Sequence, residues 1–513
     1  MSFQTPDEEA VSAHAGAVEI APEMDRESLK AASVNGVAVT IGSQFVRLAL
    51  QFAYQVLIAR LLLPRDFGLV ALCAPAIAFV QLFADLGLTQ ATVQKAAISQ
   101  PQLSFLFWVN VGLGLVLAGA TFAAAPLVGM FYGDPRVVPL TRAFGALLAV
   151  GGFYSQHLAL LNRRMRFGSL AIVDLASFGC GALAGLGAAR SGMGAWALFI
   201  NSGVTSLSTL LLAWSITRWA PGRPTLHEAR GLLSFGGNLT GLNVVNFFAR
   251  NLDNVLVGRF SGIVSLGLYD RAYKLCLLPF NQIVWPFARV GGPLLSRSAS
   301  DTDLYRRAYL SLLQTMLLFT YPAVVYAILF SDRLILLGLG ARWLGVVPIF
   351  RVLALDAFVA PIASSLGWLL VSQGRTVAMR NCGMASSVIF LACFAAGVLV
   401  RGPVGVAAGY ALAGVVELII LALATSRRGP IGLRVLVAAI SPILVCAGAT
   451  ALALAILRPL APVTLLGLLG SGMTSYLVFA GLLLLFPGGR RLLDAMRTQG
   501  QDRLRGMLKR VAA

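Results

Sequence analysis

Long apolar stretches follow one another along most of this chain, and they constrain its fold more than any other feature. About twenty apolar residues cross a bilayer as one α-helix. The connections between the stretches are short, and no loop is long enough to form a sizeable domain. The sequence therefore predicts an all-α integral membrane protein with about 14 transmembrane helices. The expected spans are 35–59, 67–88, 105–130, 137–161, 168–189, 193–217, 235–258, 272–295, 308–330, 345–371, 379–400, 404–426, 433–457 and 463–486.

Composition and charge agree with this class. The sequence is 58% hydrophobic and only 12% charged, which lies far from the soluble norm. The net charge is +19, but acidic residues gather in the first 33 positions and basic residues after position 488. Basic residues near membrane helices favour the cytoplasmic side, so both termini are expected there. The acidic segment predicts a disordered tail, and the basic one predicts an amphipathic helix on the inner leaflet or a solvated tail.

One expected span, 235–258, carries a polar stripe. Asn243, Asn246, Arg250, Asp253 and Asn254 are three or four residues apart, so they share one face of a helix. A charge near the bilayer centre costs about 2.5–3.5 kcal/mol on insertion scales. The stripe therefore lines a wet cavity, or else neighbouring helices satisfy it and the arginine pairs structurally with the aspartate.

A similar stripe occurs earlier in the chain. A shift of 199 positions (243 − 44) places Gln44, Arg47, Gln51, Tyr54 and Gln55 on the five residues of the later stripe. Duplicated halves with a site between them are a common plan of transporters. We therefore expect two pseudo-symmetric six-helix lobes plus a terminal pair of helices. The predicted parts are a disordered acidic cytoplasmic tail (1–33), an N-terminal lobe (34–217), a cytoplasmic linker (218–231), a C-terminal lobe (232–426), transmembrane helices 13 and 14 (427–487) and a basic amphipathic cytoplasmic tail (488–513).

The two stripes together suggest a binding cavity. Arginine presents a planar fork of donors that matches phosphate oxygens, and amides suit hydroxyl-rich sugars. This chemistry favours a polar anionic ligand such as a phosphate that carries sugars. The candidate substrate-binding residues are Gln44, Arg47, Gln51, Gln55, Asn243, Asn246, Arg250, Asn254 and Arg289.

Single carboxylates inside the expected spans are a second set of candidates. Asp85, Asp253, Asp174 and Glu417 could each bind a coupling proton or sodium ion. Each has a structural alternative, because a carboxylate also caps turns and forms hydrogen bonds between helices.

Several function classes are not supported by the sequence. The six cysteines all fall in apolar spans without a Cys-x-x-Cys pair, so neither a metal nor another cofactor is expected. No Gly-x-x-x-x-Gly-Lys-Ser/Thr loop for ATP occurs, and no large loop could carry catalytic carboxylates. The sequence therefore predicts a protein that is not an enzyme and does not bind nucleic acid, with membrane lipids as partners.

Four short sequence motifs resemble those of a known family. They are ARLLLPRDFG at 59–68, ADLGL at 84–88, LDNVLVGR at 252–259 and LGLYDRA at 266–272. With the expected 14 spans, they resemble the polysaccharide transporter (Wzx-type flippase) family of the multidrug/oligosaccharidyl-lipid/polysaccharide exporter superfamily.

The resemblance implies a function and a site. It implies alternating access of a cavity between two lobes, lined by the first, second, seventh and eighth spans. The substrate would be an undecaprenyl-diphosphate-linked oligosaccharide, moved across the bacterial inner membrane for exopolysaccharide, capsule or O-antigen. It also implies that the cavity arginines hold the diphosphate or acidic sugars. A proton or sodium counter-ion and a polysaccharide polymerase are expected partners.

Four alternatives stay open at this point. A multidrug antiporter of the same fold would take organic cations and would favour a cavity richer in carboxylates. A peptidoglycan lipid II flippase would also use cavity arginines. A membrane enzyme acting on lipid-linked sugars lacks its catalytic loop here, and a structural scaffold gives no reason for two matching stripes.

Overall fold

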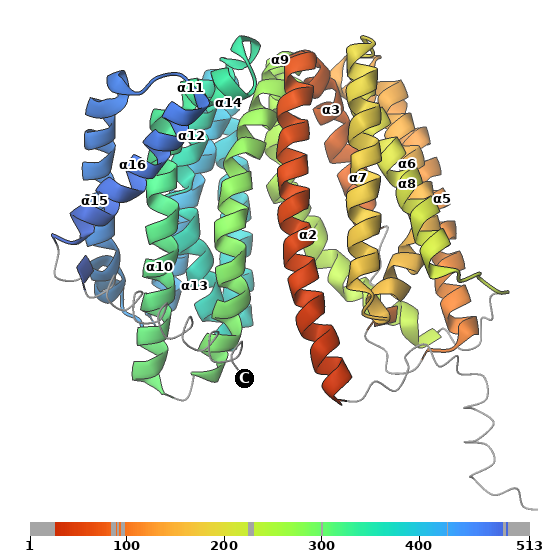
Figure 1. The fold of residues 1–513 in the computed structure, drawn as a ribbon, viewed down its shortest axis with the longest axis horizontal. Helices are drawn as coiled ribbons and strands as arrows, with labels where there is room; N and C mark the ends of the chain where they lie inside the picture. The colour runs from red at the N-terminus through yellow and green to blue at the C-terminus, as the bar shows by residue number, and fades with distance from the viewer. Residues whose placement is uncertain are drawn as a thin grey trace, which may run out of the picture. The chain divides into compact units, whose positions relative to one another are not determined.

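The computed structural model describes residues 26–83, 89, 92–93, 98–223, 230–298, 301–427, 429–485 and 489–490. Within these ranges, the description covers only the backbone of 26–39, 41, 230–246, 248–250, 278–281 and 285. The regular elements of the described chain are all helices (Figure 1). The predicted all-α class is confirmed.

The chain divides into two compact units, Met1–Arg259 and Phe260–Ala513. The division falls inside one long helical element, α9 (Arg230–Arg297), close to a break at Gly262. The predicted lobe bounds, 34–217 and 232–426, stay a prediction.

The first unit contains the helices up to Arg259 in α9. Among them, α5 packs along α6, α7 along α8, α6 against α8, and α2 against α7 (Figure 1). The first helix begins before the predicted acidic tail ends at residue 33. The bounds are α2 (Arg26–Leu61), α3 (Pro64–Gln81), α5 (Gln100–Tyr132), α6 (Val137–Arg163), α7 (Phe167–Arg190) and α8 (Trp196–Thr217).

Glycines allow the backbones of α5 and α6 to approach closely. A Cβ at Gly152 would lie 2.5 Å from the carbonyl oxygen of Asn110, and a Cβ at Gly114 would lie 2.8 Å from that of Leu148. Small residues at helix crossings are typical of membrane proteins, because lipid supplies no hydrophobic force between helices. These contacts therefore fix the crossing of two predicted spans.

The second unit contains the rest of the described chain. Here α12 and α13 pack against α14, and α10 packs against α15 and α16. Two short 3₁₀ turns, Ala341–Trp343 and Arg458–Leu460, complete it. The helices are the second part of α9, α10 (Thr302–Leu329), α11 (Ser331–Gly338), α12 (Val346–Asp356), α13 (Ala360–Ser372), α14 (Thr376–Ser426), α15 (Leu433–Leu457) and α16 (Leu465–Leu483).

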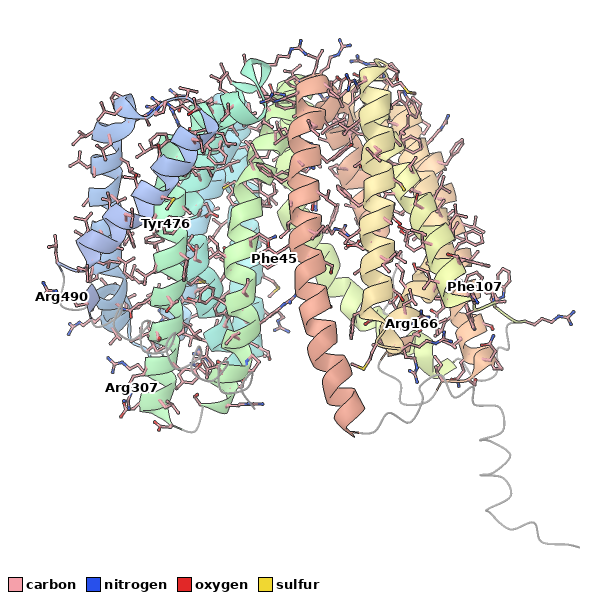
Figure 2. All side chains as sticks on the ribbon, in the orientation of Figure 1. Phe45, Phe107, Arg166, Arg307, Tyr476 and Arg490 are labelled. Carbon is pink, nitrogen blue, oxygen red and sulfur yellow. The ribbon has the colours of Figure 1, made fainter. Side chains whose placement is uncertain are left out.

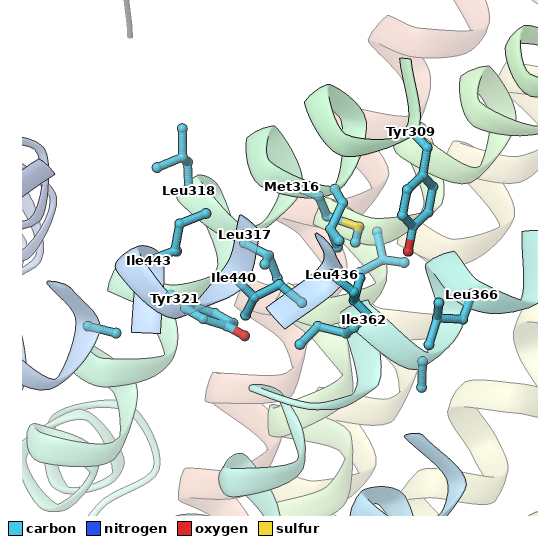
Figure 3. Packing of buried hydrophobic residues seen from close by; sticks show 14 of the residues in the cluster. Tyr309, Met316, Leu317, Leu318, Tyr321, Ile362, Leu366, Leu436, Ile440 and Ile443 are labelled. Atoms are coloured by element: carbon cyan, nitrogen blue, oxygen red, sulfur yellow. The ribbon is translucent and has the colours of Figure 1, made fainter. Parts of the chain in front are cut away.

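Tyrosines of α10 anchor the core of this unit (Figure 3). Tyr309 and Tyr321 are fully buried among aliphatic residues such as Ile440. The Tyr309 hydroxyl forms a 2.9 Å hydrogen bond with the Ser365 hydroxyl, and the Tyr321 hydroxyl donates to the carbonyl of Phe358 at 2.9 Å. A buried hydroxyl without a partner is costly, so these bonds fix how α10 meets α13.

Nine segments of the described chain are long and apolar enough to cross a membrane. One of them, α14, has 51 residues and breaks at Arg401 and Gly402, so its two halves contain the predicted spans 379–400 and 404–426. The count of 14 remains a prediction. The nine are Gln100–Tyr132, Val137–Arg163, Phe167–Arg190, Trp196–Thr217, Thr302–Leu329, Val346–Ser372, Thr376–Ser426, Leu433–Leu460 and Leu465–Leu483.

The helices expose many large apolar side chains. Leu466 is 81% exposed, Met130 78%, and Phe45 on α2 70% (Figure 2 labels Phe45). Monomeric proteins in water rarely expose so much apolar surface. A hydrocarbon environment accommodates it, in agreement with a multi-pass membrane protein.

Candidate functional site

The polar stripe of the first expected span lies on α2, which packs against α7. Gln44 is exposed, and Arg47, Gln51 and Gln55 are partly exposed. Tyr54 is buried at 6% exposure. The stripe therefore runs from an open surface into the contact with α7.

Arg47 and Asp174 form an ion pair between α2 and α7. Their side chains are 37% and 39% exposed. Phe178, one turn along α7, lies 6.0 Å from the Arg47 guanidinium carbon and 5.9 Å from the Tyr54 ring, which it meets edge-on. The carboxylate thus balances the charge of Arg47 within the first unit.

The ion pair leaves the Arg47 side chain partly exposed. A guanidinium has five N–H donors in a planar fork, and Nη1 of Arg47 contacts Oδ1 of Asp174. The half-exposed position gives a ligand access to the remaining donors. Arg47, a predicted substrate-binding residue, and Asp174, a predicted ion-coupling carboxylate, are therefore in contact, a pairing that no pattern in the sequence indicated.

The second stripe is described only at its end. The side chains of Asn243, Asn246 and Arg250 lie outside the described residues, so their predicted roles stay predictions. Asp253 is 1% exposed, and its Oδ1 accepts a 2.8 Å hydrogen bond from the backbone N–H of Asn254. The buried Asn254 Oδ1 has no hydrogen-bond partner among the described atoms.

The remaining candidates are dispersed. Asp85 lies outside the described residues. Arg289 has an exposed side chain on α9, and Glu417 is half-buried on α14.

Phe79 of α3 contacts Phe247 of α9 with ring centroids 5.4 Å apart, so within the first unit α3 and the helix that carries the second stripe are neighbours.

Asp356 is a polar residue of the second unit that the sequence analysis did not select. It lines a cavity of about 70 Å³ at the end of α12. The available signal was a single carboxylate in the apolar run 345–371. The other lining residues are Tyr273, Cys276, Leu277, Leu353, Ala357, Ala360 and Tyr410.

Residues 57–348 match the profile of the polysaccharide biosynthesis protein family. The chain belongs to this family. The match covers the helices from the end of α2 to the start of α12, including Asp174 and both halves of α9. The family match confirms the resemblance that the four sequence motifs indicated.

Relatives within polysaccharide biosynthesis agree with this membership. The chain is similar to the lipopolysaccharide biosynthesis protein WzxC of Escherichia coli K12, with 23% identity over 77% of the chain and 80% of the relative. It is also similar to the succinoglycan biosynthesis transport protein ExoT of Rhizobium meliloti, with 25% identity over 64% of the chain and 67% of the relative. The chain is therefore a polysaccharide biosynthesis protein whose relatives include a transport protein.

A solved structure shows the same fold. The lipid II flippase MurJ, in an inward closed conformation, aligns with a TM-score of 0.70 at 16% identity. The alignment covers 86% of this chain and 98% of MurJ. At this identity the likeness concerns the fold alone.

Proposed function

We propose that this protein is a flippase that moves undecaprenyl-diphosphate-linked oligosaccharide repeat units across the bacterial inner membrane for surface polysaccharide biosynthesis. The observation that carries the proposal is membership of the polysaccharide biosynthesis protein family, with relatives that include a named transport protein. The multi-pass helical architecture supports transport across a membrane. The fold shared with a lipid II flippase is also consistent with a lipid-linked substrate.

Arg47 is the residue best placed to bind the diphosphate in this proposal. Asp174 neutralises it in the absence of substrate, and a diphosphate would compete for the same guanidinium. Phosphate oxygens match the planar donor fork of arginine. Gln44, Gln51 and Gln55 on the same face of α2 offer amide groups to sugar hydroxyls.

The second stripe completes the proposed site. Asn243, Asn246, Arg250 and Asn254 would supply the equivalent groups from the second half of the duplicated sequence. The buried Asn254 Oδ1, which has no hydrogen-bond partner among the described atoms, supports a role for this stripe in binding. Arg289 is a further proposed contact.

The proposed mechanism is alternating access of two six-helix lobes, 34–217 and 232–426, joined by the cytoplasmic linker 218–231. Helices 13 and 14 (427–487) and the basic tail (488–513) follow, and both termini lie in the cytoplasm. Two compact units and a break at Gly262 support a two-part construction. Proposed partners are a proton or sodium counter-ion and a polysaccharide polymerase.

The alternatives receive less support. A cation antiporter would need carboxylates in its binding stripe, whereas the α2 stripe contains arginine and glutamines without a carboxylate. The named relatives belong to lipopolysaccharide and succinoglycan biosynthesis, which favours these glycans over lipid II. Because the transporter fold extends over most of the chain, we propose that the protein is not an enzyme.

A deletion strain that still makes its lipid-linked oligosaccharides tests the proposal. A membrane-impermeant sugar-modifying reagent, applied to right-side-out spheroplasts, reports which leaflet holds the completed units. We expect the units to accumulate out of reach on the cytoplasmic side, with loss of surface glycan. Expression of the wild-type gene should restore both.

The control is the same strain carrying Arg47→Ala at equal membrane abundance, which should not restore export. If completed units reach the outer leaflet in the deletion strain, and no second flippase is expressed, the proposed function is wrong.

A further inference from the structure

The cavity at the end of α12 contains an acidic group, and none of the described residues that line the cavity is a lysine or arginine. Asp356 lines it together with Tyr273 and Cys276 of α9 and Tyr410 of α14. Glu417, two turns after Tyr410 on α14, lies close enough to interact electrostatically with Asp356. We propose that Asp356, with Glu417 beside it, is a proton-binding site within the second unit.

Burial of the carboxyl group is the first argument. Asp356 Oδ1 is buried and has no hydrogen-bond partner among the described atoms. A Cβ added at Gly414 would overlap this oxygen, so only glycine lets the carboxyl group lie against α14. An ionised carboxylate with a buried oxygen that lacks a hydrogen-bond donor is so costly that it takes up a proton or a cation instead.

The surrounding charges are the second argument. None of the residues that line the cavity is a lysine or arginine. The nearest base earlier on α12, Arg351, donates to Ser331 at 2.8 Å and pairs with Asp332 at 3.5 Å. Glu417 adds a second acidic group. The electrostatic environment therefore favours a bound positive charge.

The backbone at Asp356 supports a binding site here. The predicted continuous span 345–371 is interrupted, because α12 ends at Asp356 and α13 begins at Ala360. Irregular backbone within a membrane segment is tolerated where it lines a cavity. The two helix ends that meet here carry opposite partial charges, which offset each other, so burial and Glu417 decide the preference.

The chemistry of the lining favours a proton over a metal ion. The walls offer one carboxylate, two phenol hydroxyls and one thiol, which is too few oxygens to replace the hydration shell of a hard cation. A cavity of about 70 Å³ has room for several water molecules, since each needs about 10–15 Å³. Water could then carry a proton to and from Asp356.

The helical spacing of α14 explains how the site is assembled. Tyr410, Gly414 and Glu417 are four and three residues apart, so they share one face. Tyr273 meets Tyr410 edge-on with ring centroids 5.8 Å apart, which closes the cavity between α9 and α14. A role of this proton in driving transport rests on the proposed flippase function, whereas proton binding itself does not.

Infrared difference spectroscopy tests proton binding without any transport measurement. The full-length protein in lipid nanodiscs is titrated from acid to alkaline pH, and the C=O stretch of a protonated carboxyl group is followed. We expect one such band to disappear as the pH rises and to shift when the protein is labelled with ¹³C-aspartate. The labelled wild type needs no substitution, so the result does not depend on the folding of a variant.

Three variants assign the band. Asp356→Asn should abolish it, and Glu417→Gln should retain it but make it disappear at a lower pH, because one neighbouring negative charge is gone. Asp174→Asn is the matched control and should leave the band unchanged, since Asp174 is paired with Arg47. A missing band, a band insensitive to aspartate labelling, or a band that persists in Asp356→Asn would overturn the proposal. If the wild-type protein shows the band but does not transport lipid-linked oligosaccharides, the flippase function alone would be wrong.

Discussion

Replacing Arg47 should separate its structural contact from its proposed role in binding substrate. Arg47→Ala removes the ion pair with Asp174 and also removes the proposed ligand of the diphosphate. Asp174→Asn removes only the ion pair. The exchanged variant, Arg47→Asp with Asp174→Arg, rebuilds an ion pair but places an acid on α2 where the substrate would bind.

The expected loss of stability on removing the Arg47–Asp174 ion pair follows from how exposed its side chains are. With side chains 37% and 39% exposed, the pair resembles exposed ion pairs, which contribute about 0.2–1 kcal/mol. A hydrogen bond to a charged group contributes about 1.5–3 kcal/mol, which corresponds to roughly 10- to 150-fold in affinity. Arg47→Ala should therefore reduce transport at least about tenfold while lowering stability only slightly.

The assay compares two quantities in the wild type and the four variants Arg47→Ala, Asp174→Asn, Arg47→Lys and the exchanged variant. Thermal unfolding in detergent reports stability, and export of completed lipid-linked units in the deletion strain reports transport. We expect Asp174→Asn to keep most of its transport and the exchanged variant to regain stability without regaining transport. Arg47→Lys should lie between wild type and alanine, because lysine keeps the charge but lacks the planar fork.

One result would refute this reasoning. If Arg47→Ala and Asp174→Asn lose transport equally, and the exchanged variant restores it, then Arg47 acts only through its structural ion pair.

Three further predictions concern the framework around the sites. Tyr309→Phe should lower the free energy of unfolding by about 1 kcal/mol, because a buried hydroxyl hydrogen bond is lost; an unchanged value in a denaturant titration would contradict the observed bond. Gly405→Leu should abolish the monodisperse peak in size-exclusion chromatography, because the new side chain would clash with the backbone of the other half of α14. The control Gly448→Leu should retain the peak, because position 448 faces open space. The Arg136 guanidinium lies 2.7 Å from the Asp134 carboxylate in the turn between α5 and α6 and holds the pKa of Asp134 below its usual range. The ionised Asp134 therefore stabilises the fold above the usual aspartate pKa, and this stabilisation is lost as the pH falls through the lowered pKa. Asp134→Asn should therefore be slightly less stable than wild type at neutral pH and equal to it in strong acid, and a difference that persists in acid would contradict this linkage.

Hydropathy predicted the helical framework well, because the length of an apolar run limits where a membrane helix can begin and end. The predicted spans 105–130 and 433–457 agree closely with α5 and α15. The interruption between α12 and α13 was missed, since the run 345–371 has the length of one span and only two charged residues, Arg351 and Asp356. Pro361 in the first turn of α13 was the available signal, because proline is favoured where a helix begins.

The candidate sites were harder to predict, because contacts between distant residues depend on which helices pack together. Arg47 and Asp174 were selected for separate roles, and only the packing of α2 on α7 brings them into contact. Asp356 gave no periodic pattern, and its importance comes from Gly414 and Glu417 on another helix. Sequence periodicity reveals the face of one helix but not the residues opposite it.

Flipping by the purified protein tests the central claim most directly. The full-length protein is reconstituted into liposomes with a fluorescent short-chain polyprenyl-diphosphate oligosaccharide, and a membrane-impermeant quencher reports how much of the lipid lies in the outer leaflet. The proposed function predicts that wild-type protein makes the inner-leaflet pool accessible to the quencher and that Arg47→Ala does so at least about tenfold more slowly. Equal rates in protein-free liposomes and in liposomes containing the wild-type protein would contradict the proposal that this chain moves lipid-linked oligosaccharides.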